Sequence, residues 1–206
     1  MITKTEIMDI LSSIKTSRSR PYCSEMDFQT DFIVQAVKAL ESKYIFVPGY
    51  IPLRSNKRMM VDCMVKDKHS AHETYIEFKL KTKKLDDVMF DGIRINKGAD
   101  NPSLGRLECW SDISRIEKAK LGSEIANGFL ILLTDIDAYL GSNETINCNM
   151  NSGNHKPGDR SGVNGDGAFK TIKIECPYKF EYFHFNSGPV TGKRTKHEYR
   201  CLVVEI

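Results

Sequence analysis

The feature that most constrains the fold is a run of five consecutive apolar residues, Phe129–Leu133, inside the segment GFLILLTD. A strand that is apolar at every position must be covered on both faces, whereas a half-exposed strand alternates apolar and polar residues. The run is far shorter than the roughly 20 apolar residues that a membrane span needs. We therefore expect a central strand with further layers on both faces, and no membrane partner.

Two amphipathic helices are predicted near the N-terminus and a third before the central strand. Apolar residues recur at helical spacing over Ile7–Ile14, after the T-x-x-E start signal at Thr3. A stronger pattern follows the N-cap residue Ser24 and continues to about Ser42. The third helix is expected from about Leu107 to Leu121. This order of elements predicts a mixed α/β protein.

Strand-like segments lie between the second and third helices and again near the C-terminus. The segment YIFVPGYIPL contains two prolines and a glycine, which predicts a bent or edge strand. RMMVDCMV and ETYIEFKLK, joined by the polar stretch KDKHSAH, predict a β-hairpin. Three more strands are expected in FKTIKIEC, KFEYFHF and EYRCLVVEI.

The length and composition favour one domain with a long loop. A chain of 206 residues suits a single domain with one core. Asn, Gly, Ser and Asp dominate 141–167, which predicts a mobile loop before C-terminal strands over 168–206. The six cysteines form no CxxC pair, and the N-terminal residues lack a signal-peptide pattern, so we expect reduced cysteines and a cytoplasmic location.

The predicted hairpin carries the most informative polar residues. Asp62 lies in its first arm, and Glu77 and Lys79 lie in the second. Residues two apart in a strand point to the same side, so a register that places Asp62 beside Glu77 would bring two carboxylates and an ammonium together. Mg²⁺ prefers such hard oxygen ligands. A metal and a lysine at one patch can stabilise charge, or hold and help deprotonate a water, in phosphodiester hydrolysis.

Asp62, fourteen intervening residues and Glu77-Phe78-Lys79 resemble the motif of the PD-(D/E)XK superfamily of restriction-endonuclease-like nucleases, with Val61 in place of the motif's proline. The resemblance covers about residues 20–140. It implies a restriction-endonuclease-like α/β/α sandwich with a central mixed sheet. It also implies that Asp62, Glu77 and the backbone carbonyl of Phe78 hold Mg²⁺, with Mn²⁺ as a substitute, and that Lys79 is the catalytic lysine. Some members add a glutamate and a glutamine from the first core helix, which by position are Glu25 and Gln29.

Each of these residues also has a structural interpretation. Glu77 and Lys79 could form the solvated face of an edge strand. Glu25 could be a first-turn residue that suits the helix dipole, and Gln29 could be an exposed polar residue. His69 and His72 fall at the expected hairpin tip, where solvated polar residues are typical. Asp112, Arg115 and Glu117, in WSDISRIE, could form helix-surface pairs or lie behind a site.

The net charge of +3 is too small to indicate a partner, but its distribution is uneven. Between Tyr50 and Lys84, nine basic residues face four acidic ones, a local charge of +5. Such a patch favours contact with a phosphate backbone, and the expected contacts are Arg54, Lys57, Arg58, Lys81 and Lys83.

We therefore expect a Mg²⁺-dependent DNA endonuclease of restriction, defence or repair type, with RNA as another possible substrate. Because many endonucleases cut both strands as dimers, a homodimer is compatible with this expectation. Two alternatives stay open, namely a non-catalytic nucleic-acid-binding protein on the same fold and a hydrolase of small phosphate compounds.

Overall fold

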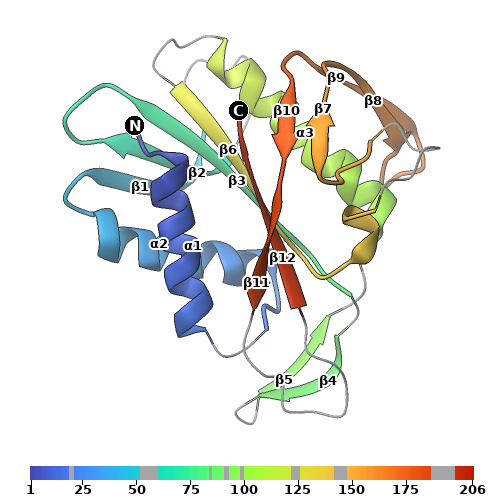
Figure 1. Cartoon of the computed structure of the whole chain (residues 1–206), viewed down its shortest axis with the longest axis horizontal. Helices are drawn as coiled ribbons and strands as arrows, with labels where there is room; N and C mark the ends of the chain where they lie inside the picture. Colours follow the sequence, from blue (N-terminus) through green and yellow to red (C-terminus); the bar gives the residue numbers. More distant parts are fainter. Residues whose placement is uncertain are drawn as a thin grey trace.

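A six-stranded mixed sheet lies at the centre of the computed structural model (Figure 1). The structure describes residues 1–18, 21–51, 60–83, 85–90, 93–97, 100–121, 126–141, 148–186 and 198–206. The strands of the sheet, in spatial order, are β1 (Tyr44–Tyr50), β2 (Val61–Asp67), β3 (Glu73–Lys81), β6 (Ala126–Thr134), β12 (Glu198–Glu205) and β11 (Tyr182–Asn186). β3 and β6 pair in parallel, and the other neighbours pair antiparallel. The predictions of a mixed α/β fold, a central mixed sheet and an edge position for β1 are confirmed.

Helices and small strand pairs complete the fold. The helices are α1 (Lys4–Ser17), α2 (Glu25–Leu40), α3 (Pro102–Lys120) and the short 3₁₀ helix η1 (Asp137–Tyr139). The strands outside the main sheet are β4 (Leu85–Phe90), β5 (Ile93–Lys97), β7 (Gly153–His155), β8 (Gly158–Val163), β9 (Phe169–Ile174) and β10 (Tyr178–Phe180). The β4–β5 hairpin, which follows β3 and precedes α3 in the chain, projects away from the main sheet (Figure 1). No helix within the described ranges is long and apolar enough to cross a membrane.

The apolar run in β6 divides between two cores on opposite faces of the sheet. Phe129, Ile131 and Leu133 belong to the core beneath α1 and α2, and Leu130 and Leu132 belong to the core beneath α3. All five side chains are buried. Because successive strand residues point to opposite faces, a strand between two cores must be apolar throughout. The prediction of a central, doubly covered strand is confirmed.

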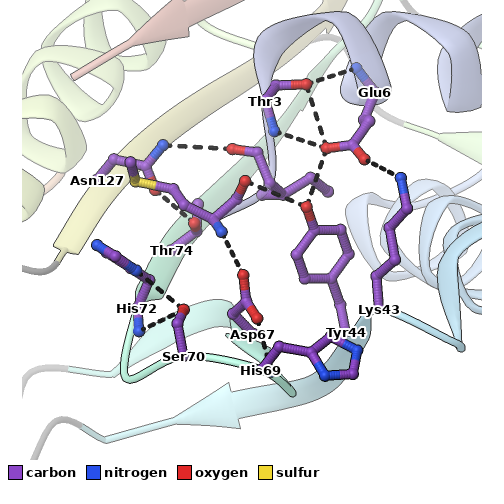
Figure 2. Close-up of polar contacts among 12 residues, drawn as sticks. Thr3, Glu6, Lys43, Tyr44, Asp67, His69, Ser70, His72, Thr74 and Asn127 are labelled. Carbon is purple, nitrogen blue, oxygen red and sulfur yellow. Dashed lines mark hydrogen bonds and ion pairs between the residues drawn. The ribbon is translucent and has the colours of Figure 1, made fainter.

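The predicted start of α1 is confirmed and also fastens this helix to the sheet (Figure 2). Thr3 Oγ1 accepts the amide hydrogen of Glu6, and the Glu6 carboxylate accepts the amide hydrogen of Thr3. The same carboxylate accepts hydrogen bonds from Lys43 and from the Tyr44 hydroxyl, both at 3.1 Å. Glu6 thus caps α1 and holds its first turn against the beginning of β1.

α2 and α3 each begin after a residue whose side chain caps the helix. Ser24 Oγ accepts the amide hydrogen of Asp27, which confirms the predicted start of α2. α3 begins at Pro102, five residues before the predicted start, because Asn101 caps it and proline suits the first helical position. Its first turns bury Gly105 and Arg106 instead of an apolar stripe, so apolar spacing alone missed them.

The prediction of a mobile loop over 141–167 is wrong for 153–163, which form β7 and β8. β8 pairs with β9 in a hairpin, and β7 pairs with β10. These strands are polar because each lies at the surface and is covered on one side only, so their composition resembles that of a loop. Residues 142–147 lie outside the described part of the chain. KFEYFHF, expected as one strand, divides at Glu181 into β10 and β11, which belong to different sheets.

Candidate functional site

The β2–β3 hairpin has the register that brings Asp62 beside Glu77. Cys63 pairs with Ile76, so the next residues along the two strands are Asp62 and Glu77. The amide of Phe78 donates a hydrogen bond to Asp62 Oδ2 at 2.8 Å. This bond fixes one oxygen of the Asp62 carboxylate against the backbone of β3.

Glu77 and Lys79 point toward α3 from the interior of the sheet. Ile76, Phe78 and Leu80 alternate with them and pack into the core beneath α1 and α2. β3 lies between β2 and β6, and the Glu77 residue is only 1% exposed. The interpretation of Glu77 and Lys79 as the solvated face of an edge strand is therefore wrong.

Two carboxylates from different helices hold the Lys79 ammonium. Its Nζ lies 2.9 Å from Asp112 Oδ2 on α3 and 3.5 Å from Glu25 Oε1 at the start of α2. Burial lowers the pKa of Lys79, but the two carboxylates outweigh burial and hold the pKa above its usual range. Lys79 therefore stays charged across the physiological pH range.

Arg115 joins the buried acids from the other side. Its Nη2 lies 2.6 Å from Glu77 Oε1 and 2.7 Å from Asp112 Oδ1. Burial is the largest cause that raises the pKa of Glu77, and the charges of Asp112 and Asp62 raise it further, while Arg115 and Lys79 oppose the rise. Burial likewise raises the pKa of Asp112. Asp62, Glu77 and Asp112 thus form an acid cluster, in which Lys79 and Arg115 favour the charged forms of Glu77 and Asp112 against the effect of burial.

The first turns of α2 contribute both residues that the resemblance implied. Glu25 Oε2 accepts the amide hydrogen of Leu80 at 3.1 Å, and burial raises the pKa of Glu25 despite the nearby Lys79. Gln29 Nε2 donates to the carbonyl oxygen of Asp62 at 2.6 Å. Gln29 is buried, so its interpretation as an exposed residue is wrong. It braces the backbone of β2, whereas Glu25 reaches Lys79 itself.

An open cleft of about 490 Å³ lies beside this cluster. It is lined by Glu25, Lys79, Lys81, Leu104, Leu107, Glu108, Ser111, Asp112, Arg115, Asn164 and Lys170. Lys81 Nζ pairs with Glu108 Oε2 at 2.6 Å inside the cleft. The cleft therefore joins the acid cluster to cationic side chains from three elements of the fold.

The remaining predicted residues are distributed unevenly. Of the expected nucleic-acid contacts, Lys81 lines the cleft, and Lys83 does not line it but pairs with Asp137 at 2.9 Å. Arg54, Lys57 and Arg58 lie outside the described residues. At the hairpin tip, His72 Nδ1 is 2.9 Å from Ser70 Oγ, and the amide of His69 donates to Asp67. Figure 2 places both histidines near the start of α1.

The donor chemistry of the cluster fits a hard divalent cation. Asp62 and Glu77 supply carboxylate oxygens. Burial, together with the charges of Asp112 and Asp62, raises the pKa of Glu77, and a bound cation would oppose that rise. In the described ranges, no three acidic, histidine or cysteine side chains are already gathered as a metal-binding group. Arg115 lies against Glu77 instead. A metal at this carboxylate would therefore compete with the guanidinium for Glu77 Oε1.

Asp112 and Arg115 were only loosely assigned from the sequence. The sequence left open whether they form a helix-surface pair or lie behind a site. They do pair, but Asp112 is buried and contacts Lys79. An aspartate between Trp110 and Ile113 on the buried side of a helix is the signal that could have identified it. Asn164 was missed as a cleft residue because its segment resembled a loop. Lys170 lies in a segment that was expected to be a strand, but only the packing of β9 against α3 brings it to the cleft.

Comparison with known proteins adds no family assignment. The sequence matches no model of a known protein family, and it matches no curated protein.

Proposed function

We propose that this protein is a metal-dependent nuclease that hydrolyses phosphodiester bonds in DNA, on a restriction-endonuclease-like core. The observation that carries the proposal is the position of Lys79, whose ammonium lies between Glu25 and Asp112 on the face of β3 that also carries Glu77. The order of α2, the β2–β3 hairpin, α3 and the parallel strand β6 supports the same fold assignment.

The residues divide into metal ligands and charge-stabilising groups. Asp62, Glu77 and the carbonyl oxygen of Phe78 would hold Mg²⁺ or Mn²⁺, which supplies Lewis-acid stabilisation to the phosphate oxygens. The pKa of Lys79 lies above its usual range, so the side chain stays a protonated ammonium, which cannot accept a proton from water. Its role in the proposal is therefore electrostatic: the ammonium stabilises negative charge that develops at phosphorus.

The cleft is suited to a phosphate backbone. Lys81, Arg115 and Lys170 line it beside the acids, and it is an open surface feature bounded by α2, α3 and the β8–β9 hairpin. A polymer can lie along such a cleft and present one phosphate to Lys79. An open cleft favours this substrate over a small phosphate compound, which an enclosed pocket would suit better.

One observation favours the non-catalytic alternative. Glu77 and Asp112 each already contact a cationic side chain of the protein, so both acids have a counter-charge without a metal. A protein that only binds nucleic acid could retain this network as a structural element of the cleft.

Nicking of supercoiled plasmid DNA separates the two functions. The wild-type protein is expected to nick plasmid with Mg²⁺ or Mn²⁺ and to be inactive in EDTA. Asp62→Asn should abolish nicking, whereas Asp67→Asn, at the other end of the same strand and paired with the N-terminal ammonium, should not. Salt-sensitive plasmid binding without metal-dependent nicking would establish the non-catalytic alternative instead.

A further inference from the structure

The β8–β9 hairpin presents two different faces. Ile172 and Ile174 are buried in the core beneath α3, and the guanidinium carbon of Arg160 lies 4.6 Å from the ring centroid of Trp110 on that helix. Strand alternation directs residues 159, 161 and 163 and their partners 173, 171 and 169 to the opposite face. The hairpin is thus anchored to α3 by one face, and the other face is open.

The face that packs against α3 also places the side chain of Lys170 in the cleft. Lys170 lines the cleft with Asn164, and its Nζ lies 3.2 Å from Ser111 Oγ on α3. Among the described residues, Lys170 makes no ion pair within 4.0 Å, in contrast to Lys79 and Lys81. Its charge is therefore available to a phosphate in the cleft.

The open face carries an exposed apolar pair at the tip of the hairpin. Val163 and Phe169 are cross-strand partners, and they are 55% and 73% exposed. Hydrogen bonds between Asn164 and Ala168 close the turn beyond them: Asn164 N–H donates to the Ala168 carbonyl, and Ala168 N–H donates to Asn164 Oδ1. The aromatic ring is therefore held on a defined turn next to the cleft residues Asn164 and Lys170.

We propose that this hairpin is a stacking platform for unpaired bases, so that the substrate of the cleft has a single-stranded segment next to the cleavage site. The inference rests on the proposed nuclease function. Phe169 and Lys170 are consecutive residues near the tip, so a strand that leaves the cleft across the end of the hairpin can place a phosphate on Lys170 on one face and a base on Phe169 on the other. An aromatic ring beside a basic groove is how single-stranded nucleic acid is bound without sequence preference. Bases inside an intact duplex are already stacked and offer no free face to the ring.

Binding of fluorescein-labelled DNA, measured by anisotropy in EDTA, tests the platform. The wild-type protein is expected to bind a single strand, or a duplex with a single-stranded tail, more tightly than a blunt duplex of the same sequence. Phe169→Ala should weaken binding of the single strand by about 5- to 100-fold, and Phe169→Trp should restore it. Phe169→Leu, which is apolar but not flat, should not.

Two control variants separate stacking from general effects. Leu121→Ala removes another exposed apolar side chain, at the end of α3 and outside the cleft lining, and should leave affinity unchanged. Lys170→Ala should reduce the salt dependence of single-strand binding by about 0.7 in the log–log slope, whereas Phe169→Ala should leave that slope unchanged.

The outcomes distinguish this inference from the proposed function. If plasmid is nicked but Phe169→Ala binds single strands as well as wild type, or if blunt duplex binds best, the platform is overturned and the nuclease proposal stands. If the wild-type protein neither binds nor cleaves nucleic acid, both are overturned.

Discussion

The guanidinium of Arg115 lies 2.6 Å from the carboxylate of Glu77, one of the two acids that we propose as metal ligands. Glu77 is buried, whereas the Arg115 side chain is 34% exposed. A half-buried cation thus contacts a buried carboxyl group from the side of the cleft. A divalent cation and this guanidinium would compete for the same carboxylate.

Arg115→Met should therefore make the stability of the fold depend on metal. Without divalent ions, Glu77 and Asp112 lose the positive charge that pairs with them in the wild type. The free energy of unfolding of the variant should therefore be lower by about 3 kcal/mol. Mg²⁺ should raise the melting temperature of the variant more than that of wild type, because it binds the folded state in place of the guanidinium.

Arg18→Met is the matched control, since Arg18 also pairs with two aspartates, Asp27 and Asp31, outside the cleft lining. Mg²⁺ should not rescue its melting temperature. An equal Mg²⁺ effect on wild type and on Arg115→Met would contradict a metal site at Glu77.

Asp112→Asn should slow nicking by about 10- to 100-fold, a range typical of residues that orient catalytic groups. Asp112 Oδ2 holds Lys79 Nζ at 2.9 Å, and its negative charge is the largest influence that raises the pKa of Lys79. The variant should therefore also lose activity at a lower alkaline pH than wild type, as the ammonium deprotonates sooner. Rates measured across the alkaline range test both effects, and a wild-type pH profile would refute the role of Asp112.

Glu117→Ala should destabilise the fold without any connection to the cleft. The Glu117 carboxylate is buried and accepts hydrogen bonds from the amides of Glu175 and Cys176 and, at 2.7 Å, from the Tyr178 hydroxyl. Its removal leaves these donors without their acceptor, and we expect a loss of about 2–4 kcal/mol in urea unfolding. Glu205→Ala, at an exposed position, should change stability little. Similar free energies of unfolding for the two variants would contradict a stabilising role of these hydrogen bonds to Glu117.

His155 should make stability fall as the pH is lowered. Its ring packs against Trp110 and Phe180, and burial lowers its pKa. A histidine that is harder to protonate when folded contributes stability fully above its unfolded pKa of about 6.5 and loses that contribution as the pH falls below this value. His155→Phe, which keeps an aromatic ring, should reduce the decline in unfolding free energy between about pH 7 and pH 5. An unchanged decline would argue against this contribution.

Local signals in the sequence predicted the elements that position the site. Ser24 located the start of α2 because the first amides of a helix need an acceptor, which its hydroxyl provides. The apolar run at Phe129–Leu133 located the central strand because a strand that is covered on both faces must be apolar throughout. Strand alternation predicted that Glu77 and Lys79 share a face, whereas the register that brings Asp62 beside Glu77 comes from the structure.

What the sequence could not provide were the long-range partners. Arg115 and Lys170 lie far along the chain from Glu77 and Lys79, and only the packing of α3 and β9 brings them to the cleft. The polar strand β8 resembled a loop because it is covered on one face alone. Residues whose role depends on packing between distant segments carry little local signal.

The central claim is that Lys79 acts on a scissile phosphate, and plasmid nicking by Lys79→Ala tests it most directly. With Mg²⁺, wild type and the control Lys179→Ala, an exposed lysine paired with Glu181, should nick at equal rates. Lys79→Ala should show no nicking while its circular dichroism spectrum stays that of the wild type. Nicking by a folded Lys79→Ala protein at the wild-type rate would contradict the mechanism.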